Sequence, residues 1–162
     1  MSEQIEGRNA VLEAFRSGKC VDKLFILDGC QDGPVRTMST EREEKDTIIN
    51  YVAKRTSGSV KRDRRTSGVI AQVAAYEYAS VEDILTKAKE KGEDPFIFIL
   101  DNIEDPHNLG AIIRTANLAG AHGVIIPKRR AVGLTSTVAK TSAGALNYTP
   151  VAKVTNLGHT DR

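Results

Sequence analysis

The sequence is poor in several features on which particular protein classes depend. Its 162 residues include no tryptophan, two cysteines and 5% aromatic residues, and the net charge is only +2. No uninterrupted apolar stretch approaches the roughly 20 residues that cross a bilayer, so we expect no membrane-spanning segment. Because a polar segment without an apolar core follows Met1, we also expect no signal peptide and a cytoplasmic location.

The few cysteines and histidines carry no metal or redox signature. Cys20 and Cys30 lack the close pairing of a zinc or thiol-redox motif. The histidines His107, His122 and His159 are too widely separated for ligand spacing. The sequence therefore predicts two reduced thiols and no metal site.

Positive charge is clustered, which is more informative than the small net charge. Residues 54–65 contain six basic side chains and one acidic one, a local excess of +5: Lys54, Arg55, Lys61, Arg62, Asp63, Arg64 and Arg65. A solvated, disordered segment and a contact with a phosphate backbone are both compatible with this composition. Lys128, Arg129 and Arg130 form a second basic cluster.

Alternating strand and helix patterns predict an α/β fold with parallel sheets. Strands are expected at residues 21–27, 47–52, 69–75, 96–100, 124–126 and 148–154. Helices are expected at 6–18, 34–46, 80–92 and 135–143, and another after the loop 101–108. Local signals support individual ends, namely Asn9 and Ser80 as N-caps and Gly18 and Gly92 beyond helix C-termini.

Residues 96–120, FIFILDNIEDPHNLGAIIRTANLAG, are expected to organise the chain. The apolar run 96–100 is typical of a strand covered on both faces, and the polar loop after it lies where α/β sheets bind ligands. In the following helix Leu109, Ile112, Ile113 and Ala116 share one face, and Arg114 lies off it.

Residues 101–116, DNIEDPHNLGAIIRTA, closely resemble the first signature motif of the SpoU (TrmH-like) family of RNA ribose 2′-O-methyltransferases, within the knotted SPOUT superfamily. The matching positions are Asp105, Pro106, Asn108, Gly110, Arg114, Thr115 and Ala116. Residues 140–151, KTSAGALNYTPV, resemble the segment that leads to the family's second motif. Residues 7–15 and 69–78 resemble a small substrate-binding domain of the bacterial 23S rRNA guanosine 2′-O-methyltransferase subgroup.

This resemblance implies an organisation and an activity. Residues 1–78 would form an α/β RNA substrate-binding domain, 79–94 a linker with a helix, and 95–162 the first part of a SPOUT-type parallel-sheet methyltransferase domain. The implied reaction is S-adenosylmethionine-dependent 2′-O-methylation of a ribose in ribosomal RNA, with a guanosine of 23S rRNA as the expected target. Full-length relatives are expected to be homodimers.

The resemblance also implies site residues. Asn108 and Arg114 are the candidate catalytic residues, and Arg8, Arg62, Arg64, Arg65 and Arg114 are the candidate RNA contacts. An arginine stays charged, so Arg114 is better suited to grip an RNA phosphate and stabilise a developing alkoxide than to act as a base. A surface ion pair with Glu104 is the alternative for Arg114. Asn108 could orient Arg114, bind the ribose, or only cap the helix.

The chain also departs from the family pattern. Relatives continue past the position of Arg162 with two further motifs that tie the knot and supply nearly all cofactor contacts. We therefore expect a C-terminally truncated chain without cofactor-binding residues, without methyl transfer of its own, and with an exposed sheet edge that lowers solubility. Residues 37–45 and 55–67 also fit the family poorly, and local frameshifts in the gene are our hypothesis for them.

Two other functions remain open at this point. The first is a non-catalytic module that binds structured RNA through shape and 2′-hydroxyl contacts. The second is an unrelated small α/β protein that binds phosphate at the helix N-terminus near Asn108.

Overall fold

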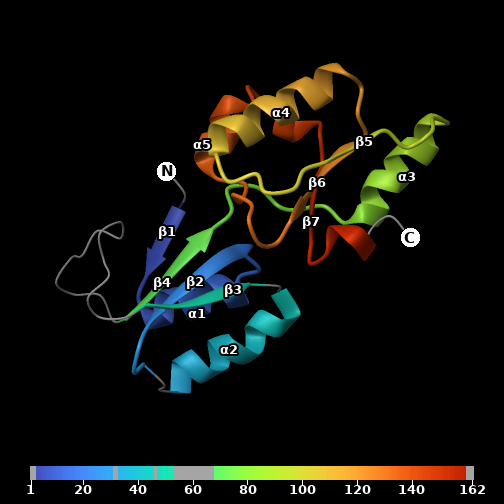
Figure 1. Ribbon diagram of the computed structural model, residues 1–162. Coiled ribbons are helices and arrows are strands. Elements are labelled where there is room, and N and C mark those ends of the chain that lie inside the picture. The colour runs from blue at the N-terminus through green and yellow to red at the C-terminus, as the bar shows by residue number, and fades with distance from the viewer. Residues whose placement is uncertain (1–2, 31–32, 46, 53–67, 160–162) are drawn as a thin grey trace. The chain divides into compact units, whose positions relative to one another are not determined.

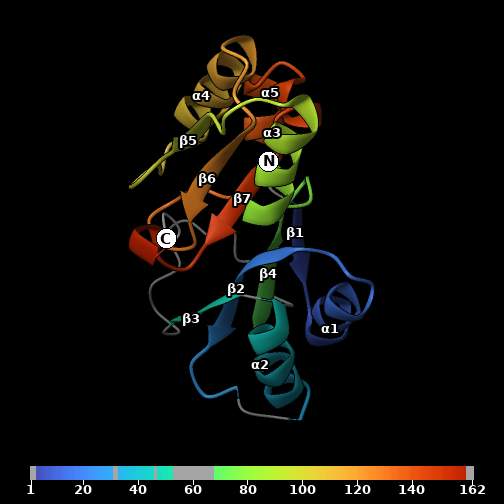
Figure 2. The same cartoon turned by 90° about the vertical axis from the view of Figure 1, so that its right-hand side faces the viewer.

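The computed structural model describes residues 3–30, 33–45, 47–52 and 68–159, and Figures 1 and 2 show it from two sides. Contacts divide the chain into two compact units, Ser2–Ala74 and Ala75–Arg162. Within the described ranges, no helix combines the length and apolarity that crossing a membrane requires.

The described part of the N-terminal unit contains four strands and two helices. In chain order they are β1 (Glu3–Glu6), α1 (Arg8–Arg16), β2 (Val21–Leu27), α2 (Gly33–Lys45), β3 (Ile48–Val52) and β4 (Val69–Val73). The sheet order is β1-β4-β2-β3, with β2 and β3 parallel and β4 antiparallel to both its neighbours. The expectation of parallel sheets throughout is therefore wrong in this unit. Strand β4 follows β3 in sequence, but it pairs with β2 on the side opposite β3 and runs antiparallel to it.

The N-cap of helix α1 lies two residues before the one that the sequence suggested. Gly7, not Asn9, is its N-cap, with a φ of 103° that favours glycine. Gly18, with a φ of 80°, follows the C-cap Ser17 as predicted. The segment before Gly7 is not helical but forms β1, a strand that its polar sequence EQIE did not predict.

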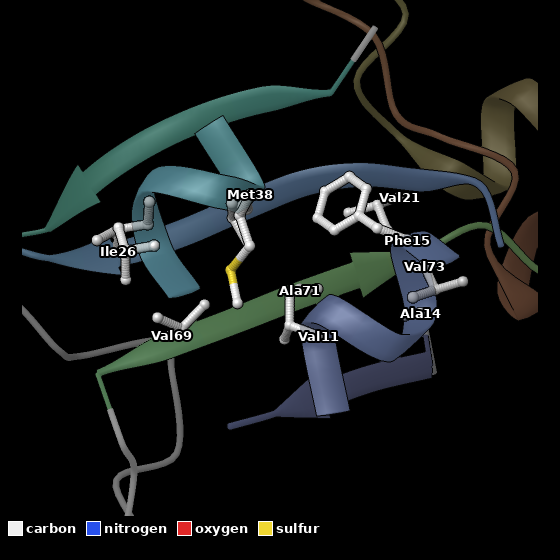
Figure 3. Packing of buried hydrophobic residues seen from close by; sticks show 11 residues of the cluster. Val11, Ala14, Phe15, Val21, Ile26, Met38, Val69, Ala71 and Val73 are labelled. Atoms are coloured by element: carbon white, nitrogen blue, oxygen red, sulfur yellow. The ribbon is translucent and has the colours of Figure 1, made fainter. Parts of the chain in front are cut away.

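The N-terminal core joins both helices to the inner face of the sheet, as Figure 3 shows. Phe15 of α1 and Met38 of α2 are fully buried in the same cluster as Ile26 of β2 and Ala71 of β4. Helix α2 has few apolar residues, yet Val35 and Met38 are both buried. These two side chains join the helix to the core of the unit.

The C-terminal unit is a three-stranded parallel sheet with helices on both faces. Its elements are α3 (Val81–Lys91), β5 (Ile97–Ile99), α4 (Pro106–Leu118), β6 (Gly123–Pro127), α5 (Ser136–Thr141) and β7 (Val151–Val154), with 3-10 turns η1 (Ala145–Asn147) and η2 (Leu157–His159). The strand order is β5-β6-β7. Val124 and Ile126 face the cluster of α4 and α5, whereas Ile125 faces α3.

The middle of this sheet is not the strand that the sequence singled out. Strand β6 is buried along its whole length. Strand β5 lies at the edge, where Phe96 and Ile99 are 46% and 51% exposed. Phe98 packs against the cluster of α4 and α5, and Ile97 packs against the cluster of α3, so β5 has contacts on both faces. Its cover is less complete than expected, because an apolar run indicates a preference for burial but does not specify which neighbours will cover the strand.

Helix α3 shows how local signals fix an element. Ser80 is the predicted N-cap and forms a capping box with Asp83, and Gly92 ends the helix in the left-handed region with a φ of 67°. Ile84 is fully buried and packs so closely that a Cβ atom at Gly123 would lie 2.6 Å from it. Leu85, next to it in the same helix, is 43% exposed.

Candidate functional site

The loop between β5 and α4 is shaped by its own polar residues. The carboxylate of Asp105 accepts hydrogen bonds from the backbone N–H groups of His107 (2.6 Å) and Asn108 (3.2 Å). Asp105 is therefore the N-cap of α4, and Pro106 follows it in the first turn. Since the cap is already supplied, the exposed side chain of Asn108 is left free of that role.

Gly110, another residue of the motif, allows α4 to meet α5 closely. A Cβ atom at this position would lie 2.6 Å from Cβ of Thr141 and 3.0 Å from the backbone of Val138 and Ser142. Such distances would force the two helices apart. The glycine therefore has a packing role and is not part of a cofactor-binding loop.

Arg114 is exposed on α4. The ion pairs seen among the described residues, His122–Glu93 and Arg130–Asp101, do not involve it, so the alternative pairing with Glu104 is not observed. Arg114 follows Asn108 by six positions, which separates them by about 9 Å along the helix and about 120° around it. The two side chains therefore project from different sides of the helix.

Of the other candidate RNA contacts, Arg8 belongs to the described part of the N-terminal unit, and the remaining three do not belong to the described residues. Arg8 is half-buried in the first turn of α1, and its Nη2 donates to Sγ of Cys30 at 3.6 Å. It also lines an open hollow of about 500 Å³ with Asn9 and Pro34. Arg62, Arg64 and Arg65 lie outside the described residues.

A second polar region lies at the carboxyl edge of the C-terminal sheet. Asp101 follows β5 and Arg130 follows β6, and the two side chains meet at 3.7 Å. The backbone N–H of Val132 donates to the carbonyl of Ile103 at 2.8 Å, which ties the two loops together. The sequence indicated a basic cluster at 128–130 but not its proximity to the motif loop, because that proximity depends on the pairing of β5 with β6.

The buried polar side chains described in the C-terminal unit offer no free donor to S-adenosylmethionine, the cofactor that the resemblance implies. The buried polar side chains described in the C-terminal unit are His122, Ser142 and Thr149. Each has an internal partner: they bond to Phe96 and Glu93, to Ala139 and to Asn117, respectively. No inward-facing donor is therefore left among them for a nucleoside or an amino-acid group. The described residues also contain no group of three or more potential metal ligands.

Comparison with known sequences defines the class of protein. The sequence model of the SpoU rRNA Methylase family matches residues 95–160. A second model, described as RNA 2′-O ribose methyltransferase substrate binding, matches residues 4–79. The chain thus combines a substrate-binding region with a methylase region, and it belongs to the SpoU (TrmH-like) family. This assignment removes the alternative of an unrelated phosphate-binding protein.

Individual relatives extend the comparison. YacO of Bacillus subtilis, named as a TrmH family tRNA/rRNA methyltransferase, is 47% identical over 99% of this chain and 65% of its own length. A relative of the same description from Staphylococcus epidermidis is 44% identical over 96% of this chain and 62% of its own length. The chain therefore spans less than two thirds of the length of these relatives.

Solved structures give weaker likenesses. The SpoU methyltransferase AviRb from Streptomyces viridochromogenes, in complex with AdoMet, is 22% identical with a TM-score of 0.45, covering 98% of this chain and 56% of that one. An AdoMet-bound rRNA methyltransferase from Sinorhizobium meliloti is 23% identical with a TM-score of 0.42, covering 94% and 54%.

Proposed function

We propose that this chain is the RNA-binding portion of an enzyme that methylates a ribose 2′-hydroxyl in ribosomal RNA, with a guanosine of 23S rRNA as the target. In this proposal residues 1–78 bind the substrate, 79–94 form a linker with a helix, and 95–162 are the first part of the methyltransferase domain. The whole protein acts in the cytoplasm as a homodimer. S-adenosylmethionine supplies the methyl group when it is bound.

The exposed side chain of Arg114 is the observation that carries the proposal. It lies within the segment matched by the methylase family and has no acidic partner among the ion pairs described. Helix α4 is anchored by Leu109 and Ile113, both fully buried, so it offers a rigid base for this guanidinium. A guanidinium on a rigid base can bind an RNA phosphate in bidentate fashion and lower the energy of negative charge on a nearby ribose oxygen.

Asn108 takes a separate role in this proposal. Its side chain is exposed in the first turn of α4, and Asp105 already caps the helix. An amide can donate to and accept from a ribose hydroxyl. We assign Asn108 to the ribose and Arg114 to a neighbouring phosphate, in keeping with the separation of about 9 Å along the helix.

The second candidate function is RNA binding without chemistry by the 162 residues alone. The buried polar groups described in the C-terminal unit are all engaged internally, which favours this possibility for the isolated chain. The two functions are compatible, since the isolated chain would bind RNA while methyl transfer would need residues that it does not supply.

A methyl-transfer assay separates the candidates. Unmodified 23S rRNA and labelled S-adenosylmethionine are given to the 162-residue chain and to a hybrid that adds the segment following the matched region in the Bacillus subtilis relative. We expect RNA binding by both proteins and methyl incorporation only by the hybrid. Incorporation by the chain alone would refute its proposed inactivity, and absence of RNA binding by both would refute the proposed function.

A further inference from the structure

The loop after β6 contains a backbone conformation that its sequence does not favour. Arg130 has a φ of 58°, in the left-handed region that L-residues other than asparagine and aspartate rarely adopt. The neighbouring loop has Asn102 in the same region with a φ of 56°, and asparagine tolerates it well. An arginine at such a position lowers stability relative to glycine.

The ion pair that Arg130 makes within the described residues does not offset this cost. The ion pair of Arg130 with Asp101 measures 3.7 Å, and the two side chains are 68% and 57% exposed. A long pair between exposed side chains contributes little stability because water and salt screen it. Strained residues of this kind are often found at functional sites, so the outlier suggests a ligand for the side chain.

The position of the strained loop indicates where such a ligand would lie. Because β5 and β6 are parallel, the loops after them lie at the same edge of the sheet, and the hydrogen bond from Val132 to Ile103 joins them. The loop after β5 leads directly into the first turn of α4, which carries Asn108. Arg129, next to Arg130, is also exposed, so two guanidinium groups occupy this edge.

We propose that Arg129 and Arg130 form a phosphate-binding site for the RNA backbone, beside the ribose position assigned to Asn108. This inference rests on the proposed function and adds a contact that the family motif does not include. Two adjacent guanidinium groups suit successive phosphates of a nucleic acid better than a single free anion. Asp101 competes with the RNA for Arg130 and weakens binding at this position.

Arg130→Gly tests the proposal because it affects stability and binding in opposite directions. Glycine adopts a φ of 58° without strain, so the melting temperature should rise by a few degrees. RNA binding should weaken about three- to tenfold, and the slope of log K against log salt should fall by about 1. Arg129→Gln should reduce the slope by a similar amount, and Asp101→Asn should strengthen binding about twofold.

Two control variants separate the possible causes. Asn102→Gly relieves the same backbone conformation without changing the charge, so it should leave RNA affinity unchanged. Lys91→Gln removes a positive charge from the last turn of α3 and should have little effect on binding. The probe is an unmodified 23S rRNA transcript, with inorganic phosphate as competitor at the same phosphate concentration.

Several results would overturn the inference. A lower melting temperature for Arg130→Gly would show that Arg130 is a structural residue. Equal weakening by Arg130→Gly and Lys91→Gln would show non-specific charge attraction, and full competition by inorganic phosphate would show a free-anion site. Unchanged binding by Arg130→Gly would refute the inference alone, whereas a wild-type chain that binds no RNA would also refute the proposed function.

Discussion

The two units of this protein differ in how completely they bury their apolar side chains. In the N-terminal unit both helices pack on the sheet around one core. Among the described residues of this unit, Tyr51 is the large apolar side chain that is exposed. The C-terminal unit exposes five such residues: Leu85, Phe96, Ile99, Leu118 and Tyr148.

This difference shows that two regions matched by the same family can differ in how fully they bury their own apolar side chains. The N-terminal unit has one core, to which both helices and the sheet contribute. The C-terminal unit has a well-packed centre in β6 but presents an apolar edge at β5. Edges of this kind are open to pairing with another strand.

The largest expected effect is loss of the N-terminal core. Phe15→Ala should destabilise the N-terminal unit by about 3–5 kcal/mol, because it empties a fully buried site. Phe96→Ala is the matched control and should cost much less, since Phe96 is already 46% exposed. Chemical denaturation with hydrogen exchange on each unit would measure both. Equal losses from the two variants would contradict the comparison.

A smaller loss is expected where α4 meets α5. Gly110→Ala places a methyl group 2.6 Å from Cβ of Thr141 and should destabilise the C-terminal unit by about 1–3 kcal/mol. Gly33→Ala, in a position with no atom within 4 Å, is the control and should be nearly neutral. If denaturation shows no difference between the variants, the close helix contact is not a determinant of stability.

The exposed edge should affect association more than stability. Ile99→Lys puts a charge on β5 and should reduce concentration-dependent self-association while changing stability by only about 0.5 kcal/mol. Tyr51→Lys makes the corresponding change on β3 of the N-terminal unit. Sedimentation velocity should show reduced self-association for Ile99→Lys and no change for Tyr51→Lys. The reverse pattern would place the self-associating surface in the N-terminal unit and contradict the comparison.

The smallest effect concerns the start of α3. Hydrogen bonds from the backbone N–H of Ser80 and then from its side chain lower the pKa of Asp83. A lowered pKa stabilises the folded state above the unfolded value of about 3.9, and this contribution is lost as the pH falls through the folded value. The protection factors of amides in the first turn of α3, which compare observed exchange with intrinsic exchange at the same pH, should therefore fall in acid. Asp83→Asn should remove this pH response, and an unchanged response would assign it to another group.

Local chemistry made part of the structure predictable from the sequence. The capping box at Ser80 and the glycine stops at Gly18 and Gly92 depend on neighbouring residues, so their positions could be predicted. The edge position of β5 and the exposure of Leu85 depend on which elements pack together, and periodicity does not contain that information.

The candidate site was predictable to a similar extent. The motif identified Asn108 and Arg114 as candidates, and the roles assigned to them stay predictions. Asp105 as the helix cap and Gly110 as a packing residue became clear only from the contacts they make. The strain at Arg130 was not predictable, because a φ of 58° in an arginine is imposed by the loops around it.

The most direct test of the central claim is methyl transfer to 23S rRNA by the hybrid protein with Arg114→Ala. Removing the guanidinium should abolish turnover while leaving the melting temperature within a few degrees of the parent, because Arg114 is exposed and lies outside the core. Turnover that survives in a folded Arg114→Ala protein would contradict the assignment of this residue to the RNA.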